Sequence, residues 1–363
     1  MSERHDVPIG VEIAAGWAWR FLVIAAAGAV GIWLMRFFSE VTVPIAIALL
    51  GTALAINAVD FLERHKIPRL LATFIVVFSM LVVFFGMLGL VGQQLSTQVT
   101  DLKANVVQGI TQVQDWLTTG PLGITDNQIQ EWVDQAKVSI SSSDTSVIAR
   151  ISEVGTTVTH IVAGFFIALF SVFFFLYEGE RIWGWAVSLF PRAARERVNS
   201  SGQTAWSSLT AFVHATVIVA LTDAMGIAFA AWVLGVPLTF AIGVLVFLGA
   251  FIPIIGAFLS GLVAVLVALV AQGPWTALFM LLAVIAVQQF EAHVLQPFLM
   301  GRLVAVHPLA IIIAIAAGVI VAGVVGALIA VPLAACLNGV VRHLTEVSQP
   351  PLPLAKPPDP EPA

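Results

Sequence analysis

The chain has 363 residues, of which 59% are hydrophobic and only 10% are charged. Soluble domains carry about 25% charged residues, so this composition excludes the ordinary water-soluble classes. The net charge of -5, with no basic stripe, excludes nucleic acid as a partner. The single cysteine, Cys336, excludes an internal disulfide and any multi-cysteine metal site.

Apolar runs recur from Trp17 to Leu337, and the mean hydropathy is +1.00. A membrane-spanning helix needs about 20 apolar residues, and the runs lack the alternation of barrel strands. They predict an all-α, polytopic helical membrane protein in contact with the lipid bilayer. The first run is too long for a signal peptide and is expected to remain as a span.

Three spans are expected first, at residues 17–38, 41–62 and 70–92. The loop at residues 63–69 holds three basic residues, which marks the cytoplasmic side under the positive-inside rule. Residues 1–92 are therefore expected to form a three-span bundle with a cytoplasmic N-terminus.

Residues 93–155 interrupt the apolar pattern. Leucine, valine and isoleucine recur every three or four positions from Leu95 to Leu117, with polar residues between them. This spacing predicts an amphipathic helical insert, which the topology places outside the membrane on the extracytoplasmic side.

Residues 156–341 are expected to form a transport core. Its full spans are predicted at residues 158–177, ending near Glu178, at residues 209–234 and around residues 275–290. The resulting topology leaves twelve of the sixteen Lys and Arg residues on the inner side. Residues 342–363, which include seven prolines after Ser348, are expected to be a disordered cytoplasmic tail.

Two apolar segments of the core contain breaks. The first segment consists of two runs, Leu238–Phe251 and Phe258–Val270, each of which is too short to cross about 30 Å of hydrocarbon. The second segment, Leu309–Leu337, is interrupted by glycines. The pattern predicts about six full spans plus two re-entrant helical hairpins, although parity also permits eight or more spans. The expected hinge or hairpin breaks are Pro253, Gly256, Gly318, Gly323 and Pro332.

No Walker loop, zinc helix, dinucleotide fingerprint or nucleophile elbow is present. We therefore expect no enzyme, no catalytic residues, no cofactor and no metal site. Asp223 lies near the middle of the fifth predicted span, where a carboxylate costs a few kcal/mol unless it has a partner or a wet cavity. It is a candidate for ion or substrate coupling, or alternatively a packing residue bonded to Thr222 or His214.

A second polar cluster follows the sixth predicted span. It supplies Gln289, Glu291, His293 and Gln296 as candidate substrate- or ion-binding residues, although a hydrated helix end would look the same. The broken helices add Pro253, Gly256 and Gly326, because a break frees backbone groups that can coordinate an ion or an anion. Close helix packing is the alternative for the glycines.

Four motifs follow one another in the chain: Phe173–Arg181, Leu234–Pro237 followed by Phe251–Gly256, Glu291–Gly301 with His307-Pro308, and Gly323–Leu333. In this order they resemble the autoinducer-2 exporter (AI-2E) family of bacterial transporters. The resemblance covers about residues 17–341, with one departure: the family often has Arg-Asp-Gly-Glu where this chain has Tyr177-Glu178-Gly179-Glu180.

The resemblance implies a secondary transporter or permease of the bacterial inner membrane. It suggests export of a small polar solute such as the quorum-sensing furanone signal, or sodium/proton exchange, with Na⁺ or H⁺ as a partner. It also implies a homo-oligomer and a moving domain built from the hairpins. A competing class is a non-transporting scaffold that binds a partner through residues 93–155.

Overall fold

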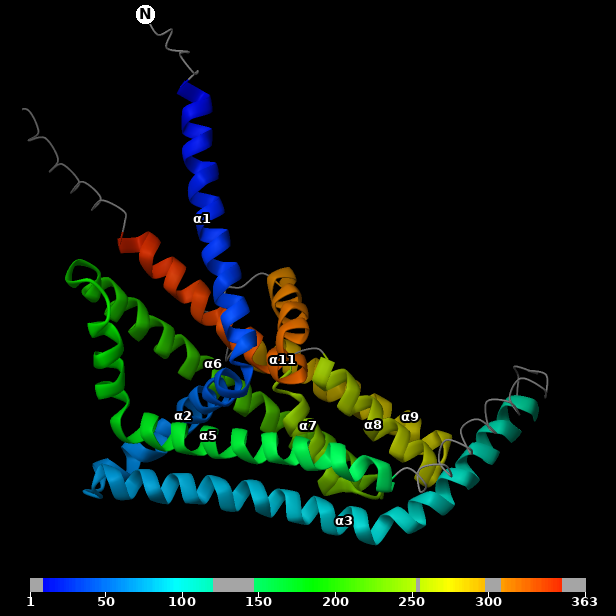
Figure 1. Cartoon of the computed structure of the whole chain (residues 1–363). Coiled ribbons are helices and arrows are strands. Elements are labelled where there is room, and N and C mark those ends of the chain that lie inside the picture. Colours follow the sequence, from blue (N-terminus) through cyan, green and yellow to red (C-terminus); the bar gives the residue numbers. More distant parts are fainter. Residues whose placement is uncertain (1–8, 120–146, 253–254, 298–307, 348–363) are drawn as a thin grey trace, which may run out of the picture.

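The computed structural model describes residues 9–119, 147–252, 255–297 and 308–347, and these residues form helices with no strand among them. Figure 1 shows the arrangement. The helices are α1 (Ile9–Phe37), α2 (Ser39–Arg64), α3 (Arg69–Thr119), α5 (Val147–Ser188), α6 (Arg192–Val233), α7 (Thr239–Gly249), α8 (Ile255–Gln272), α9 (Pro274–Phe290), the π-helix η2 (Glu291–Leu295) and α11 (Pro308–Val347).

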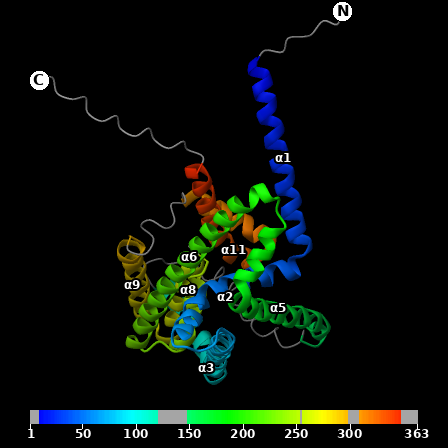
Figure 2. The same cartoon turned by 90° about the vertical axis from the view of Figure 1, so that its left-hand side faces the viewer.

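Within the described residues, seven helices are long and apolar enough to cross a membrane: α1, α2, α3, α5, α6, α9 with its π-helical end, and α11. This confirms the predicted class, a polytopic helical membrane protein. α1 projects from the rest of the molecule in both views (Figures 1 and 2), and its apolar surface is exposed throughout. A lipid environment accounts for such a helix.

Several helices run on through the predicted span ends. α3 is continuous from Arg69 to Thr119, so the third span and the amphipathic helix are one element. The fourth span does not end near Glu178: the helix bends there, at φ -123° and ψ 25°, and continues to Ser188. The bend frees a carbonyl group, and Arg69 Nε donates a 3.1 Å hydrogen bond to Leu176 O beside it.

Helices α2, α3 and α5 share one core. Small and branched side chains fill it, including Ala55 and Val59 of α2, Ala72 of α3 and Leu176 of α5, all of them buried. The small residues allow the helices to approach closely, as is usual in membrane bundles. Not every glycine in a span is such a contact: among the described residues, a Cβ on Gly28, Gly31, Gly86 or Gly89 would meet nothing within 4 Å.

Helices α6, α7, α8 and α9 share a second core around Ile227, Val246, Ala264 and Met280. α7 and α8 form a helical hairpin in which Gly249 and Gly256 touch: a Cβ on Gly256 would lie 1.6 Å from Gly249 O. With 11 residues, α7 is about 16 Å long, too short to cross the hydrocarbon. The geometry therefore favours a re-entrant hairpin over a pair of full crossings.

α11 is a second hairpin. Its backbone leaves helical geometry at Ala322 and Gly323, and a Cβ on Gly318 would lie 2.3 Å from Gly326 O on the other arm. The first arm, from Pro308 to the bend, is about 14 residues or about 21 Å long. The second arm remains helical to Val347, beyond the start of the predicted tail at residue 342.

Candidate functional site

Asp223 lies on α6 in the core that α6 shares with α9. The residue is 2% exposed, and its Oδ1 atom has no hydrogen-bond partner among the described residues. Gly226, one turn further on, allows α9 to approach: a Cβ at this position would lie 2.9 Å from Val287 Cγ2. The absence of a side chain at Gly226 therefore brings the end of α9 against Asp223.

Glu291 is the partner of Asp223. The two carboxyl groups interact electrostatically where α6 meets the end of α9, although they are far apart in the sequence. Glu291 begins the π-helix at the end of α9, in which residues five apart are bonded neighbours. Gln296 accordingly reaches back, and its Nε2 donates a 3.4 Å hydrogen bond to Glu291 Oε1.

The other predicted partners of Asp223 bond elsewhere. The Thr222 hydroxyl donates to Ile218 O at 2.9 Å, and His214 Nε2 lies 3.3 Å from Asn57 Nδ2 on α2. Gln289 and His293 are exposed, and His293 Nδ1 lies 3.1 Å from Gln289 O. The structure therefore joins Asp223, Glu291 and Gln296 and separates them from Gln289 and His293.

The Asp223–Glu291 pair has a simple chemical consequence. Two neighbouring carboxyl groups, one buried and the other half-buried, repel each other when both are ionised, so a proton on one of them or a cation beside them is favoured. No Lys or Arg in the described part of the chain forms a salt bridge with either group. The same residues contain no group of three or more His, Cys, Asp or Glu that could hold a metal ion. The pair is thus suited to binding and releasing a proton or a monovalent cation.

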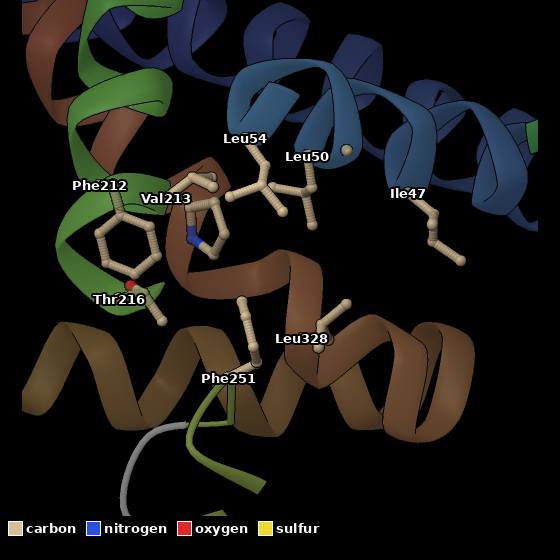
Figure 3. Close-up of a pocket in the computed structure, with 10 residues that line it drawn as sticks. Ile47, Leu50, Leu54, Phe212, Val213, Thr216, Phe251 and Leu328 are labelled. Carbon is tan, nitrogen blue, oxygen red and sulfur yellow. The ribbon is translucent and has the colours of Figure 1, made fainter. Parts of the chain in front are cut away.

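An apolar cavity of about 180 Å³ lies where the two hairpins meet α2 and α6. Figure 3 shows Leu50 and Leu54 of α2, Phe251 at the tip of the first hairpin, Leu328 of α11 and Thr216 of α6 around it. The complete lining is Ile47, Leu50, Gly51, Leu54, Phe212, Val213, Thr216, Phe251, Leu328 and Pro332.

The predicted break residues have different places around this cavity. Pro332 lines it, whereas Gly256, Gly318 and Gly326 pack against the backbone of the opposite hairpin arm and are not among the lining residues. Gly323 forms the α11 bend, and Pro253 lies outside the described residues. The glycines therefore shape the hairpins, and the side chains beside them form the cavity.

Thr216 was not a sequence candidate. It is 6% exposed, and its hydroxyl oxygen, like Asp223 Oδ1, has no hydrogen-bond partner in the described part of the chain. The seven-residue spacing of Thr216 and Asp223 is the signal that could have found it, because residues two turns apart share a helix face. A lone threonine in an apolar run is common, however, and the spacing alone gave no reason to single it out.

A buried carboxyl group, broken helices and a cavity beside the first hairpin tip are features expected of a helical membrane transport protein. The sequence model of the family described as "AI-2E family transporter" matches residues 22–346 of this chain. The chain therefore belongs to the AI-2E transporter family, which the sequence motifs had indicated. The family and its named members are transport proteins, so the chain is a transporter and not an enzyme.

Three relatives illustrate the range of the family. The chain is 40% identical to "Putative transport protein MT0215" of Mycobacterium tuberculosis over 92% of this chain and 91% of the relative. It is 23% identical to the AI-2 transport protein TqsA of Escherichia coli, over 82% and 85%. It is 25% identical to a sodium-lithium/proton antiporter of Halobacillus andaensis, over 84% and 92%.

Proposed function

We propose that this protein is an ion-coupled secondary transporter of the bacterial inner membrane that exports a small solute by alternating access. The Asp223–Glu291 pair is the observation that carries the proposal. It binds a proton or Na⁺ in one state of the cycle and releases it when the α6–α9 contact changes. A small polar solute of the autoinducer-2 kind, as the name of TqsA suggests, is the first cargo to test.

The position of the pair supports this role. α6 contacts the hairpin helices and α9, and it also contacts α2. A change of charge at Asp223 therefore acts on the helix that joins α2 to the hairpin helices. Neutralising one charge in an apolar environment is worth several kcal/mol, which is enough to shift a two-state equilibrium.

The test is solute flux in proteoliposomes under an imposed proton or Na⁺ gradient. Wild-type protein should show gradient-dependent flux, and Asp223→Asn and Glu291→Gln should each reduce it at least tenfold while the purified protein keeps its elution volume and helicity. Glu180→Gln, which changes a carboxylate that is not in the pair, is the matched control. Unchanged flux in both pair variants would reject the ion site.

Cation/proton antiport is the second candidate, and the carboxyl pair favours it because antiport needs only a site that protons and cations share. In the same vesicles, Na⁺ or Li⁺ added against a proton gradient should collapse the gradient without any organic cargo. Absence of flux under every gradient would instead favour a scaffold that works through residues 93–155.

We further propose that both termini lie in the cytoplasm and that the protein forms a homo-oligomer. The exposed apolar surface of α1 and the basic loops between the spans support these two points. Size-exclusion chromatography with light scattering measures the number of subunits directly.

A further inference from the structure

Two polar side-chain contacts join separate groups of helices. The first group consists of α2, α3 and α5 and the second of α6 to α9, and each group packs around a core of its own. The backbone N–H of Ala241 on α7 donates a 2.9 Å hydrogen bond to Gln94 Oε1 on α3. Asn57 Nδ2 on α2 lies 3.3 Å from His214 Nε2 on α6. Both contacts therefore depend on how the two groups lie against each other.

The two contacts lie at opposite ends of the interface between the groups. The loop between α2 and α3 marks one end of the molecule. Asn57 is about 10 Å from this loop along α2, whereas Gln94 is about 37 Å from it along α3. The difference is close to the thickness of the membrane hydrocarbon, about 30 Å. Each contact is consequently near one surface of the membrane, where the interface would open.

The Gln94 contact takes the place of a helix cap. Ala241 lies in the first turn of α7, where a backbone N–H has no acceptor within the helix. Leu238, at the N-cap position, has an aliphatic side chain that cannot accept a hydrogen bond. Gln94, 147 residues away in the sequence, supplies the acceptor instead. The start of α7 thus loses its acceptor whenever the two groups separate at this end.

Both contacts are suited to breaking and re-forming. None of the four residues is fully buried, so water can satisfy their polar groups after separation. A hydrogen bond that is exchanged for bonds to water changes the ratio of two states by about 2- to 10-fold. Such a contact biases an equilibrium between two arrangements without fixing either of them.

We propose that the two contacts are the latches of alternating access: the Gln94–Ala241 latch opens in one state of the cycle, and the Asn57–His214 latch opens in the other. The inference rests on the proposed transport function and assigns its two gates. When one group rocks against the other about an axis between the latches, one end of the interface opens as the other end closes. Both latches are formed in the structure, as in a state that is closed to both sides.

Hydrogen–deuterium exchange tests the first latch without any gradient. Gln94→Ala should speed exchange at the Ala241 amide at least 10-fold in nanodiscs, because no other acceptor is available within the first turn. Gln94→Glu keeps an acceptor oxygen, so exchange should stay within threefold of the wild type. Ser96→Ala is the matched control, since the Ser96 hydroxyl donates to Gln93 O of its own helix. Equal exchange in Gln94→Ala and the wild type would overturn the latch.

Reversible cross-links test the role of both latches in transport. Cysteine pairs are introduced in the Cys336→Ser background, which is otherwise free of cysteine: Gln94→Cys with Ala241→Cys, and Asn57→Cys with His214→Cys. A short bis-methanethiosulfonate bridges each pair, and a reductant removes the bridge. Each bridge alone should lower proteoliposome flux at least 10-fold, because both ends have to open in every cycle, and reduction should restore it.

Two controls isolate the movement between the groups. Gly51→Cys with Val172→Cys joins α2 to α5 within the first group, where a Cβ on Gly51 would lie 3.3 Å from Val172 Cγ2. Bridging this pair should leave flux within twofold of the untreated variant. The single-cysteine variants of each latch carry the reagent without a bridge and should also keep their flux.

The outcomes separate the latches from the transport function. The probes are Na⁺ added against a proton gradient and a furanone of the autoinducer-2 kind. Flux that persists when either latch is bridged would overturn the latches and leave transport intact. Equal inhibition by the Gly51–Val172 bridge would also overturn them, because the loss would then not depend on movement between the groups. Absence of flux for both probes before bridging would reject the transport function, and the latches with it.

Discussion

Asp223 and Thr216 are buried polar side chains on one face of one helix, and Asp223 Oδ1 and the Thr216 hydroxyl oxygen have no hydrogen-bond partner among the described residues. Each costs free energy in the folded protein, because a polar group removed from water without a hydrogen bond is destabilising. A chain that needed only stability would have apolar residues at both positions. Asp223 lies against Glu291, and a carboxyl group at this depth is what the proposed ion-coupling role predicts.

The pair depends on Gly226. Alanine at this position would put a Cβ 2.9 Å from Val287 Cγ2 and force α6 and α9 apart. Overpacking of this kind costs about 1–3 kcal/mol, so Gly226→Ala should lower the melting temperature of the purified protein and reduce ion-coupled flux. Val287→Ala removes the clashing methyl groups, and the double variant should recover most of both losses. Additive losses in the double variant would show that the glycine has another role.

Gly323 has a conformational role at the α11 bend. Its φ of 60° with ψ of -142° is a region that L residues with a side chain avoid at a cost of about 1–3 kcal/mol. Gly323→Ala should therefore destabilise the protein by that amount, as followed by thermal unfolding, although a Cβ there would meet nothing within 4 Å. Gly86→Ala, in a helix with the same open space, should be neutral or stabilising. Equal effects of the two substitutions would contradict the conformational explanation.

The hairpins are elements held by direct backbone contact. A Cβ on Gly256 would meet Gly249 O at 1.6 Å, and backbone atoms have no alternative rotamer to which they can move. Gly256→Ala should therefore separate α7 from α8, with a stability loss at the upper end of the overpacking range of about 1–3 kcal/mol or beyond, and should abolish flux. Gly89→Ala is the control, because its added methyl group meets nothing. Chemical denaturation and vesicle flux, measured on both variants, provide the comparison.

At the scale of the helices, some features were predictable from the sequence and others were not. The spans and the two breaks were predictable, because membrane thickness sets the length of an apolar run and Pro and Gly interrupt a helix. The continuity of α3 past residue 92 was not predicted, because a fall in hydropathy marks where a helix leaves the membrane and does not mark where it ends. Likewise, the charged residues near Glu178 were expected to end the fourth span, but the helix only bends at Glu178 and continues to Ser188.

The candidate site was only partly predictable for the same kind of reason. Asp223 and Glu291 stood out individually, because charges are rare in apolar runs. Their pairing depends on the packing of α6 against α9, and Gln296 joins them only because a π-helix brings residues five apart together. The cavity takes its walls from four distant segments, so no local pattern could have indicated it.

At the scale of the whole molecule, two ends can be recognised. Gln272 Nε2 donates a hydrogen bond to Gly235 O, which joins the ends of α6 and α8. Gln94 Oε1 accepts one from the backbone N–H of Ala241, which joins the extension of α3 to the start of α7. These helix ends therefore lie together at one end of the molecule. The loop between α2 and α3 and the turn between α5 and α6 belong to the opposite end and carry Arg64, Lys66, Arg192, Arg195 and Arg197. The positive-inside rule predicts that this basic end is cytoplasmic, which agrees with the proposed position of the termini.

Cysteine labelling in the Cys336→Ser background tests this orientation. Ala193→Cys lies at the exposed start of α6 on the basic end, and Trp275→Cys lies at the first turn of α9 on the other end, where the tryptophan is 74% exposed. A membrane-impermeant maleimide should label Trp275→Cys in intact spheroplasts and Ala193→Cys only in inside-out vesicles. The reverse pattern would turn the molecule over, so that the first hairpin entered from the cytoplasm and the α11 hairpin from outside.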